Sequence, residues 1–237
     1  MMKKLIFIFI TILSLLFTAC GTAVSTETVA KAPVTIAVID TGFSSAAISE
    51  ESVIEGKNYL DDSLSTEDTY GHGTAIASVI LADCPDALLV PLVSNAYDDG
   101  KIMQVDNDVL AVGSVNKEET EISAFSQRGA WVDIYTCGED VEIKTLSGNT
   151  RTSDGTSYSA AKVTAYAAII LQEAEGTFTA AELREELENY TKTLPDGKNI
   201  YTEQMFLKCY APYGTLTMRC IFYVNDSYSR PSFGSKP

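Results

Sequence analysis

A nearly unbroken run of apolar positions extends over residues 160–171, and only Lys162, Thr164 and Tyr166 interrupt it. A helix over this run would be apolar on nearly every side. Because such a helix needs neighbours on all of its faces, the pattern predicts a helix that is buried in the core of its domain.

Ser157 stands just before this run, in the sequence Asp154-Gly155-Thr156-Ser157-Tyr158-Ser159. In the first turn of the predicted helix, unpaired backbone N–H groups and the positive end of the helix dipole favour negative charge that develops nearby. Such a position suits a nucleophile whose reaction passes through an oxyanion. A helix cap is the alternative interpretation, because Ser, Thr and Asp are preferred N-cap residues.

A second apolar run covers residues 34–39, where Thr35 is the one polar residue, and it ends at Asp40. Its β-branched residues predict a buried strand that delivers a carboxylate to its carboxyl end. The alternative is that Asp40 closes an Asx-turn.

His72 is the single histidine of the chain, and it lies between Gly71 and Gly73 at the start of a third apolar run, residues 75–82. Any chemistry that needs an imidazole therefore has one candidate. The two glycines allow close approach of the backbone. The alternative is a loop histidine with an ordinary hydrogen bond. An acid, a base and a hydroxyl thus follow one another along the chain as Asp40, His72 and Ser157.

The remaining patterns predict strands that alternate with helices. Strands are expected at 52–60 and 88–93, and a helix at 179–189 that Thr179 and Glu182 would open with a capping box. Alternating elements favour an α/β fold with a mostly parallel sheet, whose active site lies at the carboxyl ends of the strands.

The amino terminus has the pattern of an export signal. Lys3 and Lys4 precede an apolar run over residues 5–17, which is too short for an ordinary membrane span, and small residues follow. Cys20 directly after Ala19 resembles the bacterial lipoprotein signal, so we expect residues 1–19 to be removed and Cys20 to be lipidated. Plain secretion is the alternative, and a lipidated Cys20 would be the protein's sole attachment to a membrane.

Residues 20–33 are small and polar and predict a flexible tether, which leaves no room for a folded propeptide before a domain at residues 34–207. The chain carries a formal charge of −15, which argues against nucleic acid and anionic lipid as partners. No cofactor is expected. A zinc site is disfavoured, and structural calcium has no assignable ligands.

Three motifs together resemble those of the subtilisin-like serine proteases, the subtilase family (peptidase family S8). They are Ile39-Asp40-Thr41-Gly42, Gly71-His72-Gly73-Thr74 with Ala77, and Gly155-Thr156-Ser157 with Ser159. Residues 108–115, Phe125-Ser126 and residues 131–138 extend the resemblance, which covers roughly residues 33 to 207. It implies a subtilisin-like three-layer fold and an exported serine endopeptidase that acts on peptides or proteins, with Asp40, His72 and Ser157 as catalytic triad.

The chain departs from the family between His72 and Ser157, because the interval is short. The missing piece corresponds to a strand that lines the substrate cleft and to an Ala-Gly-Asn motif whose asparagine donates to the oxyanion. Neither Asn95 nor Asn107 stands in that context, so we expect no side-chain amide beside Ser157. The alternative function is therefore a catalytically impaired, subtilase-like lipoprotein that serves as a binding or scaffold module. The sequence leaves its oligomeric state open.

Residues 208–237 predict an added C-terminal β-hairpin. A two-residue turn at Gly214 and Thr215 would place Cys209 opposite Cys220, where a disulfide could form in an exported protein. Cys84 and Cys137 are also available, so other pairings stay open.

Overall fold

The computed structural model describes residues 33–94, 109–174, 177–194, 197–201 and 219–223. The chain divides into two compact units, Met1–Ala30 and Lys31–Pro237, and all of the described residues belong to the second. The expected signal segment, Cys20 and the tether up to residue 32 lie outside the described residues. Among the described residues, no helix is long and apolar enough to cross a membrane.

Two helices form the centre of the second unit. α3 (Thr156–Glu173) is the predicted core helix, and it packs against α2 (His72–Asp83). Four of the thirteen buried residues of α3 are alanines, so neighbouring elements can approach the helix closely at these positions. The main core joins these helices to the first sheet, and its largest fully buried side chains include Ile36, Ile76, Ile80, Leu89, Ile170, Leu171 and Leu187.

The first sheet is entirely parallel and has the strand order β10-β1-β3-β2. Its strands are β1 (Thr35–Asp40), β2 (Lys57–Asn58), β3 (Leu88–Val93) and β10 (Arg219–Tyr223). The bounds of β3 agree with the prediction. The strand expected at 52–60 is reduced to β2, because η1 (Glu50–Ser52) precedes it and the Asn58 side chain accepts hydrogen bonds from the N–H groups of Leu60 and Asp61.

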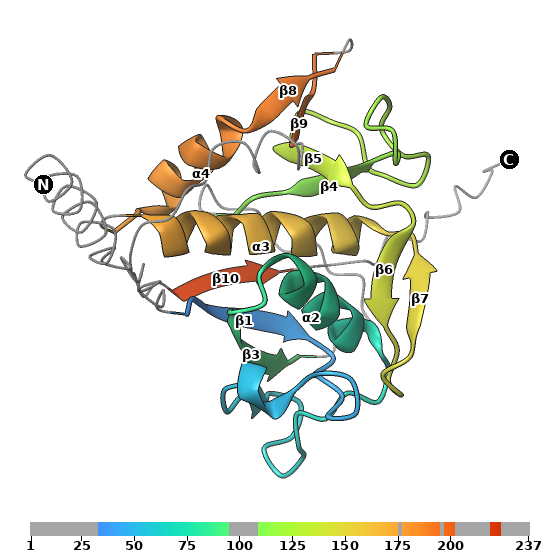
Figure 1. Cartoon of the computed structure of the whole chain (residues 1–237), viewed down its shortest axis with the longest axis vertical. Helices are drawn as coiled ribbons and strands as arrows, with labels where there is room; N and C mark the ends of the chain where they lie inside the picture. Colours follow the sequence, from blue (N-terminus) through green and yellow to red (C-terminus); the bar gives the residue numbers. More distant parts are fainter. Residues whose placement is uncertain (1–32, 95–108, 175–176, 195–196, 202–218, 224–237) are drawn as a thin grey trace, which may run out of the picture. The chain divides into compact units, whose positions relative to one another are not determined.

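A second sheet has the order β4-β5-β9-β8. Its strands are β4 (Val112–Val115), β5 (Ile134–Cys137), β8 (Thr191–Thr193) and β9 (Asn199–Tyr201). β4, β5 and β9 are parallel, and β8 runs antiparallel to β9. A smaller apolar cluster that includes Val115, Tyr135 and Ile200 supports this sheet. The mostly parallel α/β architecture is therefore confirmed, although eight of the described strands lie in two separate four-stranded sheets (Figure 1).

An antiparallel hairpin leads into α3. It consists of β6 (Val141–Lys144) and β7 (Thr150–Ser153). Val141 and Ile143 are buried and Glu142 is exposed, which is the alternation of a strand with one face on the core. α4 (Ala180–Glu188) follows α3, and the predicted capping box of Thr179 and Glu182 opens it as expected.

The C-terminal segment contributes β10, which lies parallel to β1 along all five of its residues, from Thr35↔Arg219 to Ile39↔Tyr223. β10 belongs to one arm of the expected hairpin. The turn at Gly214 and Thr215, as well as Cys209, lies outside the described residues, so the hairpin and its disulfide stay predictions. Neither Cys84 nor Cys137 is part of a disulfide.

Candidate active site

Asp40 and His72 meet at the carboxyl end of β1. Both carboxylate oxygens of Asp40 lie close to His72 Nδ1, Oδ1 at 2.9 Å and Oδ2 at 2.8 Å. The backbone N–H of Thr41 also donates to Asp40 Oδ1 at 2.7 Å. The Asp40 and His72 side chains are only 3% and 9% exposed, so little water competes for their interaction. The arrangement holds Nδ1–H as the donor and directs Nε2 away from the carboxylate.

Close packing of the backbone around Gly73 allows Asp40 and His72 to come into contact. A Cβ on Gly73 would lie 2.3 Å from the carbonyl oxygen of Gly42 and 3.1 Å from Asp40 Oδ1. Gly73 N–H donates to Thr41 Oγ1 at 2.9 Å. The loop after β1 and the first turn of α2 can therefore touch only because position 73 has no side chain.

Asp68 is a residue of this site that the sequence analysis did not single out. Its Oδ1 accepts hydrogen bonds from the N–H groups of Tyr70 and Gly71 at 2.9 and 2.8 Å. Its Oδ2 accepts from the N–H and Oγ1 of Thr74 at 2.9 and 2.6 Å. Gly71, the N-cap residue of α2, has no side chain to do this. Asp68 thus caps the helix that begins with His72.

These contacts perturb the ionisation of Asp68. Burial alone would raise the pKa of the carboxyl, but the hydrogen bonds from Thr74, Gly71 and Tyr70 together outweigh it and lower the pKa below its ordinary value of 3.8. The carboxylate is therefore the form that the helix start requires. The six-residue spacing between Asp68 and Thr74 was the signal in the sequence that indicated this cap. Asp61, Asp62 and Glu67 lie in the same loop, so Asp68 was hard to distinguish from them.

Ser157 is the second residue of α3, and it is 2% exposed. Its hydroxyl oxygen is buried and has no hydrogen-bond partner among the described residues. The structure thus brings Asp40 and His72 into direct contact and describes no hydrogen bond from Ser157 to either of them.

The turn that carries Ser157 is fixed to the end of β5. Ser159 Oγ donates to the carbonyl oxygen of Thr136 at 3.0 Å, and Gly155 N–H donates to the carbonyl oxygen of Gly138 at 2.9 Å. Gly138 N–H in turn donates to Ser114 Oγ of β4 at 3.1 Å. These buried bonds hold the start of α3 in one position relative to the second sheet.

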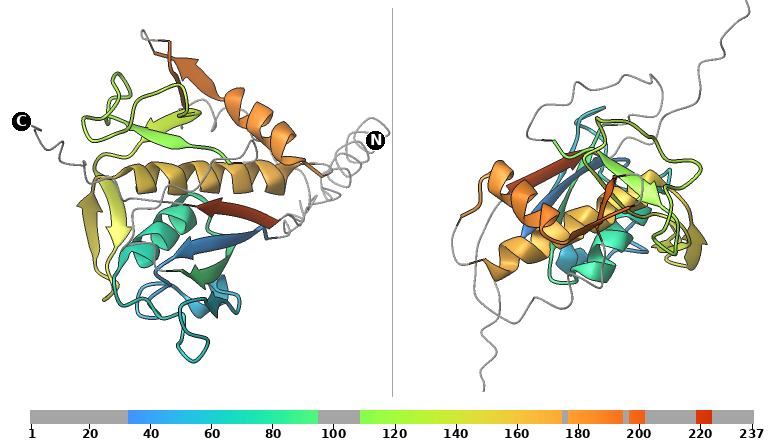
Figure 2. Two further views of the ribbon diagram at one scale, coloured as in Figure 1. Left: turned by 180° about the vertical axis from the view of Figure 1, so that it is seen from behind. Right: turned by 90° about the horizontal axis from the view of Figure 1, so that it is seen from above.

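The carboxyl end of β1 and the start of α3 lie toward the same side of this unit, that of the β6–β7 hairpin, in the two opposed views of Figure 1 and Figure 2. α2 and α3 also pack against each other. The sequence motifs of Asp40, His72 and Ser157 therefore come from elements that share one region of the fold.

Two further expectations concern what stands near this region. Asn95 and Asn107 lie outside the described residues, so the absence of a side-chain amide beside Ser157 stays a prediction. Within the described part of the chain, no group of three or more His, Cys, Asp or Glu side chains could hold a metal ion.

Comparison with known proteins gives the family. The subtilase family model matches residues 91–206. The fold is similar to that of a cold-adapted subtilisin-like serine proteinase, with 20% identity, a TM-score of 0.60, and coverage of 71% of this chain and 88% of that one. The matched residues, just under half of the chain, belong to the subtilase family, and the fold is that of a shortened subtilisin-like protease. A lanthipeptide protease has the same fold, with 16% identity, a TM-score of 0.65, and coverage of 76% and 90%.

A third solved structure, MycP1 with its N-terminal propeptide removed, aligns over 77% of this chain and 93% of its own chain, with 18% identity and a TM-score of 0.61. No curated protein matches the chain significantly. The family that the model describes is one of serine proteases. The family match includes Ser157 and begins after Asp40 and His72, whose assignment therefore depends on the motifs and the geometry.

Proposed function

We propose that this subtilase is an exported serine endopeptidase in which Asp40, His72 and Ser157 form the catalytic triad. The observation that carries the proposal is the contact of both Asp40 carboxylate oxygens with His72 Nδ1 at 2.8 to 2.9 Å. A buried carboxylate in this position orients the imidazole and stabilises the imidazolium that forms during the reaction.

In the proposed reaction, His72 Nε2 takes the proton of the Ser157 hydroxyl as Ser157 Oγ attacks the peptide carbonyl carbon. The tetrahedral intermediate collapses to an acyl-enzyme when His72 returns the proton to the leaving amine, and water then releases the acid by the same steps. Catalytic hydrogen bonds are often long before substrate binds, so the unpartnered Ser157 hydroxyl is compatible with this role.

Among the described residues, we expect the backbone N–H of Ser157 at the start of α3 to donate to the oxyanion. The helix dipole adds positive potential at the same place. A missing asparagine donor would reduce turnover by about 100- to 1,000-fold relative to a complete site. We therefore expect a slow peptidase.

Labelling by a fluorophosphonate tests the proposal, because the probe reacts with serine hydroxyls that a base activates. We expect one adduct, on Ser157, in the folded protein, and its loss in Ser157→Ala and His72→Ala. Ser147→Ala is the matched control, since Ser147 is an exposed loop serine, and it should label like the unmodified chain. A folded protein that does not label contradicts the proposal.

The Ser157 hydroxyl without a hydrogen bond also favours a second candidate, a non-catalytic binding or scaffold module of the same fold. In that case the unmodified protein would cleave no casein, and a partner captured by it would also be captured by Ser157→Ala. Attachment to the bacterial surface through a lipidated Cys20 belongs to both candidates. Mass spectrometry of the mature amino terminus would show the acyl chains.

A further inference from the structure

The outer edge of the first sheet is formed by the chain that runs beside β3. Val53 pairs with Leu89, Ile54 N–H donates to the carbonyl oxygen of Leu89 at 2.8 Å, and Tyr59 N–H donates to that of Val93 at 2.7 Å. β2 lies between these points and is the last strand in the order β10-β1-β3-β2. Within the described part of the chain, no strand pairs with its outer side. An edge of this kind can accept an extended peptide as an additional strand.

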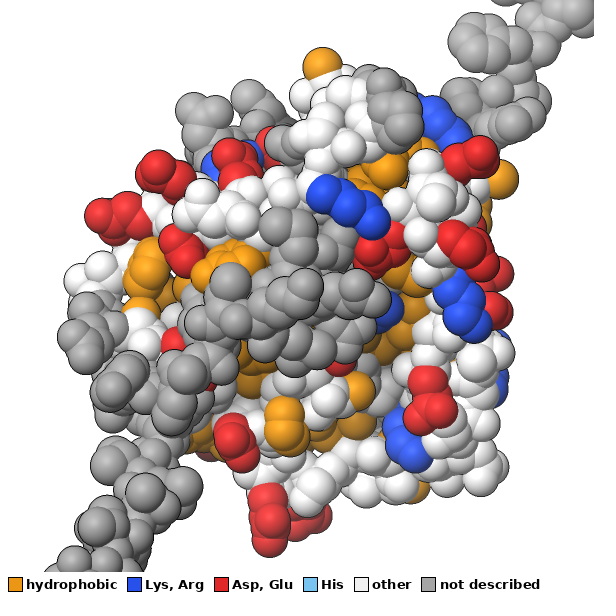
Figure 3. Space-filling model, turned by 45° about the horizontal axis from the view of Figure 1, so that its top comes forward, with side chains coloured by type: hydrophobic (Ala, Val, Ile, Leu, Met, Phe, Trp, Pro, Cys, Tyr) orange, Lys and Arg blue, Asp and Glu red, His pale blue; other side chains and the backbone are white. Residues whose placement is uncertain are grey.

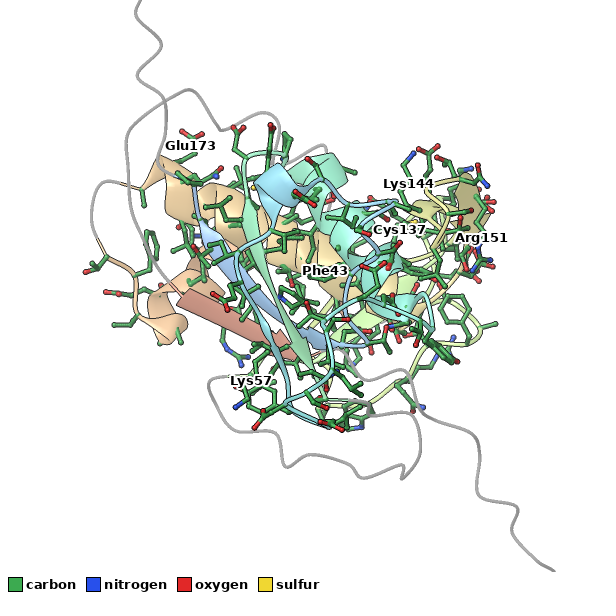
Figure 4. The ribbon with its side chains drawn as sticks, turned by 90° about the horizontal axis from the view of Figure 1, so that it is seen from below. Phe43, Lys57, Cys137, Lys144, Arg151 and Glu173 are labelled. Carbon is green, nitrogen blue, oxygen red and sulfur yellow. The ribbon has the colours of Figure 1, made fainter. Side chains whose placement is uncertain are left out.

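A hollow of about 590 Å³ lies along this edge. This volume is in the range of binding pockets. The residues that line it are Glu50, Val53, Ile54, Glu55, Gly56, Lys57, Asn58, Asp62, Leu64, Ser65 and Thr66. We call these residues the β2 edge surface. Figure 4 shows Lys57 near the ends of the strands and well away from Cys137, which ends β5.

The wall of the hollow is held in place before any ligand arrives. The buried Asn58 side chain donates to the carbonyl oxygen of Ser65 at 2.9 Å and accepts from Leu60 N–H at 3.0 Å. Asp61 Oδ1 accepts from the N–H and Oγ of Ser63 at 2.8 and 2.6 Å. A preformed wall reduces the ordering cost of binding.

The same stretch exposes apolar side chains. Among the described residues, eight large hydrophobic side chains are exposed, and Ile54, Tyr59, Leu60 and Leu64 are four of them. Ile54 and Leu64 line the hollow itself. Grouped exposed apolar side chains of this kind mark interaction sites.

Charge identifies the occupant. Glu50, Glu55 and Asp62 line the hollow and are exposed, and Lys57 is the one basic residue of its lining. Lys57 is already engaged, with its Nζ 3.2 Å from Asp62 Oδ1 and 5.2 Å from the ring centre of Tyr59. The excess of carboxylates favours a cationic ligand.

We propose that the β2 edge surface binds an extended, basic peptide segment as an additional strand, with apolar residues alternating with its lysines or arginines. Asn58 is in register with Val93 and, through it, with Asp40. Two strand spacings therefore separate the surface from the proposed triad, or about 10 Å. A protein substrate held here could reach the triad with another segment. That recruitment role depends on the proposed function, whereas binding itself does not.

Fluorescence anisotropy with labelled acetyl-Lys-Val-Lys-Val-Lys-amide tests binding on full-length Ser157→Ala, which removes the proposed nucleophile and so prevents cleavage of the probe. At physiological salt we expect saturable binding. The double variant Glu55→Lys with Asp62→Lys should raise the Kd at least about 10-fold. Glu185→Lys with Glu188→Lys on α4 changes the net charge equally at exposed positions and should leave binding unchanged.

The control is needed because acidic side chains are spread over the surface, as Figure 3 shows for one face. Equal weakening by both double variants would mean diffuse attraction of a basic peptide and would overturn the proposal. A probe with N-methylated amides keeps its charges but cannot add as a strand, so equal binding of that probe would also overturn it. Binding should slow hydrogen exchange at residues 53–59.

The acidic probe acetyl-Glu-Val-Glu-Val-Glu-amide should not bind, and equal binding of it would contradict the role of charge. Fluorophosphonate labelling of Ser157 is measured separately on the unmodified chain. A labelled protein without peptide binding would refute the β2 edge surface alone, and binding without labelling would refute the peptidase alone.

Discussion

Both carboxylate oxygens of Asp40 lie within hydrogen-bonding distance of His72 Nδ1, at 2.9 and 2.8 Å. Asp40→Asn keeps the shape of this contact but removes the charge and offers an N–H group to the imidazole. We expect kcat/KM for a peptide substrate to fall about 10⁴-fold, because the wrong tautomer is then favoured. Asp86→Asn, at an exposed position, is the control and should keep full activity.

Gly73→Ala should damage the same contact through its backbone. The added Cβ would meet the carbonyl oxygen of Gly42 at 2.3 Å and Asp40 Oδ1 at 3.1 Å. Because both neighbours would have to move, we expect a loss of about 1 to 3 kcal/mol in the free energy of unfolding. Peptidase activity should fall in the fraction that remains folded. Denaturant titration and active-site labelling measure the two effects, and unchanged stability would contradict this packing.

Asp68→Asn should destabilise the start of α2. The amide nitrogen cannot accept the hydrogen bonds that Oδ1 or Oδ2 accepts from Tyr70, Gly71 and Thr74. We expect a loss of roughly 2 kcal/mol in the free energy of unfolding. Asp62→Asn is the matched control in the same loop, since its side chain is 80% exposed, and it should change stability by under about 0.5 kcal/mol.

The contribution of Asp68 should depend on pH. Hydrogen bonds hold the pKa of Asp68 below its ordinary value of 3.8, so the carboxylate stabilises the folded state above that pH. The contribution is lost as the pH falls through the lowered folded-state pKa. The difference in unfolding free energy between the unmodified chain and Asp68→Asn should therefore shrink from pH 7 toward pH 3. A difference that grows on acidification would reverse the assigned direction.

Ser159→Ala removes the hydrogen bond that ties the first turn of α3 to the carbonyl oxygen of Thr136. We expect a loss of about 1 kcal/mol in stability. Labelling of Ser157 should slow as well, because the turn that carries it is less well fixed. Thermal unfolding and the rate of labelling measure the two effects. Faster labelling in Ser159→Ala would contradict the prediction, because it would mean that the hydrogen bond holds Ser157 in a less reactive position.

Sequence patterns correctly predicted those elements that depend on local contacts and not on distant segments of the chain. β3 has nearly the bounds of a continuous apolar run over residues 87–93, which lies between Asp86 and Ser94. The capping box of Thr179 and Glu182 is a contact within one turn, so it too is readable from spacing. The family motifs likewise led to the contact between Asp40 and His72.

Contacts between segments that lie far apart in the sequence could not be predicted. β10 pairs with β1 although more than 180 positions separate them, and the hydrophobic pattern of a strand does not indicate which other strand it pairs with. Asp68 was hidden among other acidic loop residues, since its role depends on where Thr74 lies in the folded chain. The β6–β7 hairpin carries a readable alternation, and Gly148 with a φ of +77° marks its turn, so a closer reading of the pattern would have found it.

The strand that ends in Asp40 lies between β3 and β10, one made early and the other late in synthesis. The edge of β1 that pairs with β10 therefore lacks its partner strand until residue 223 has been synthesised. Long-range pairing of this kind is slow to form, because a large loop has to close first. The first sheet should thus be completed only after residue 223 has been made, so under the proposed function a partly synthesised chain would lack the full sheet that carries Asp40.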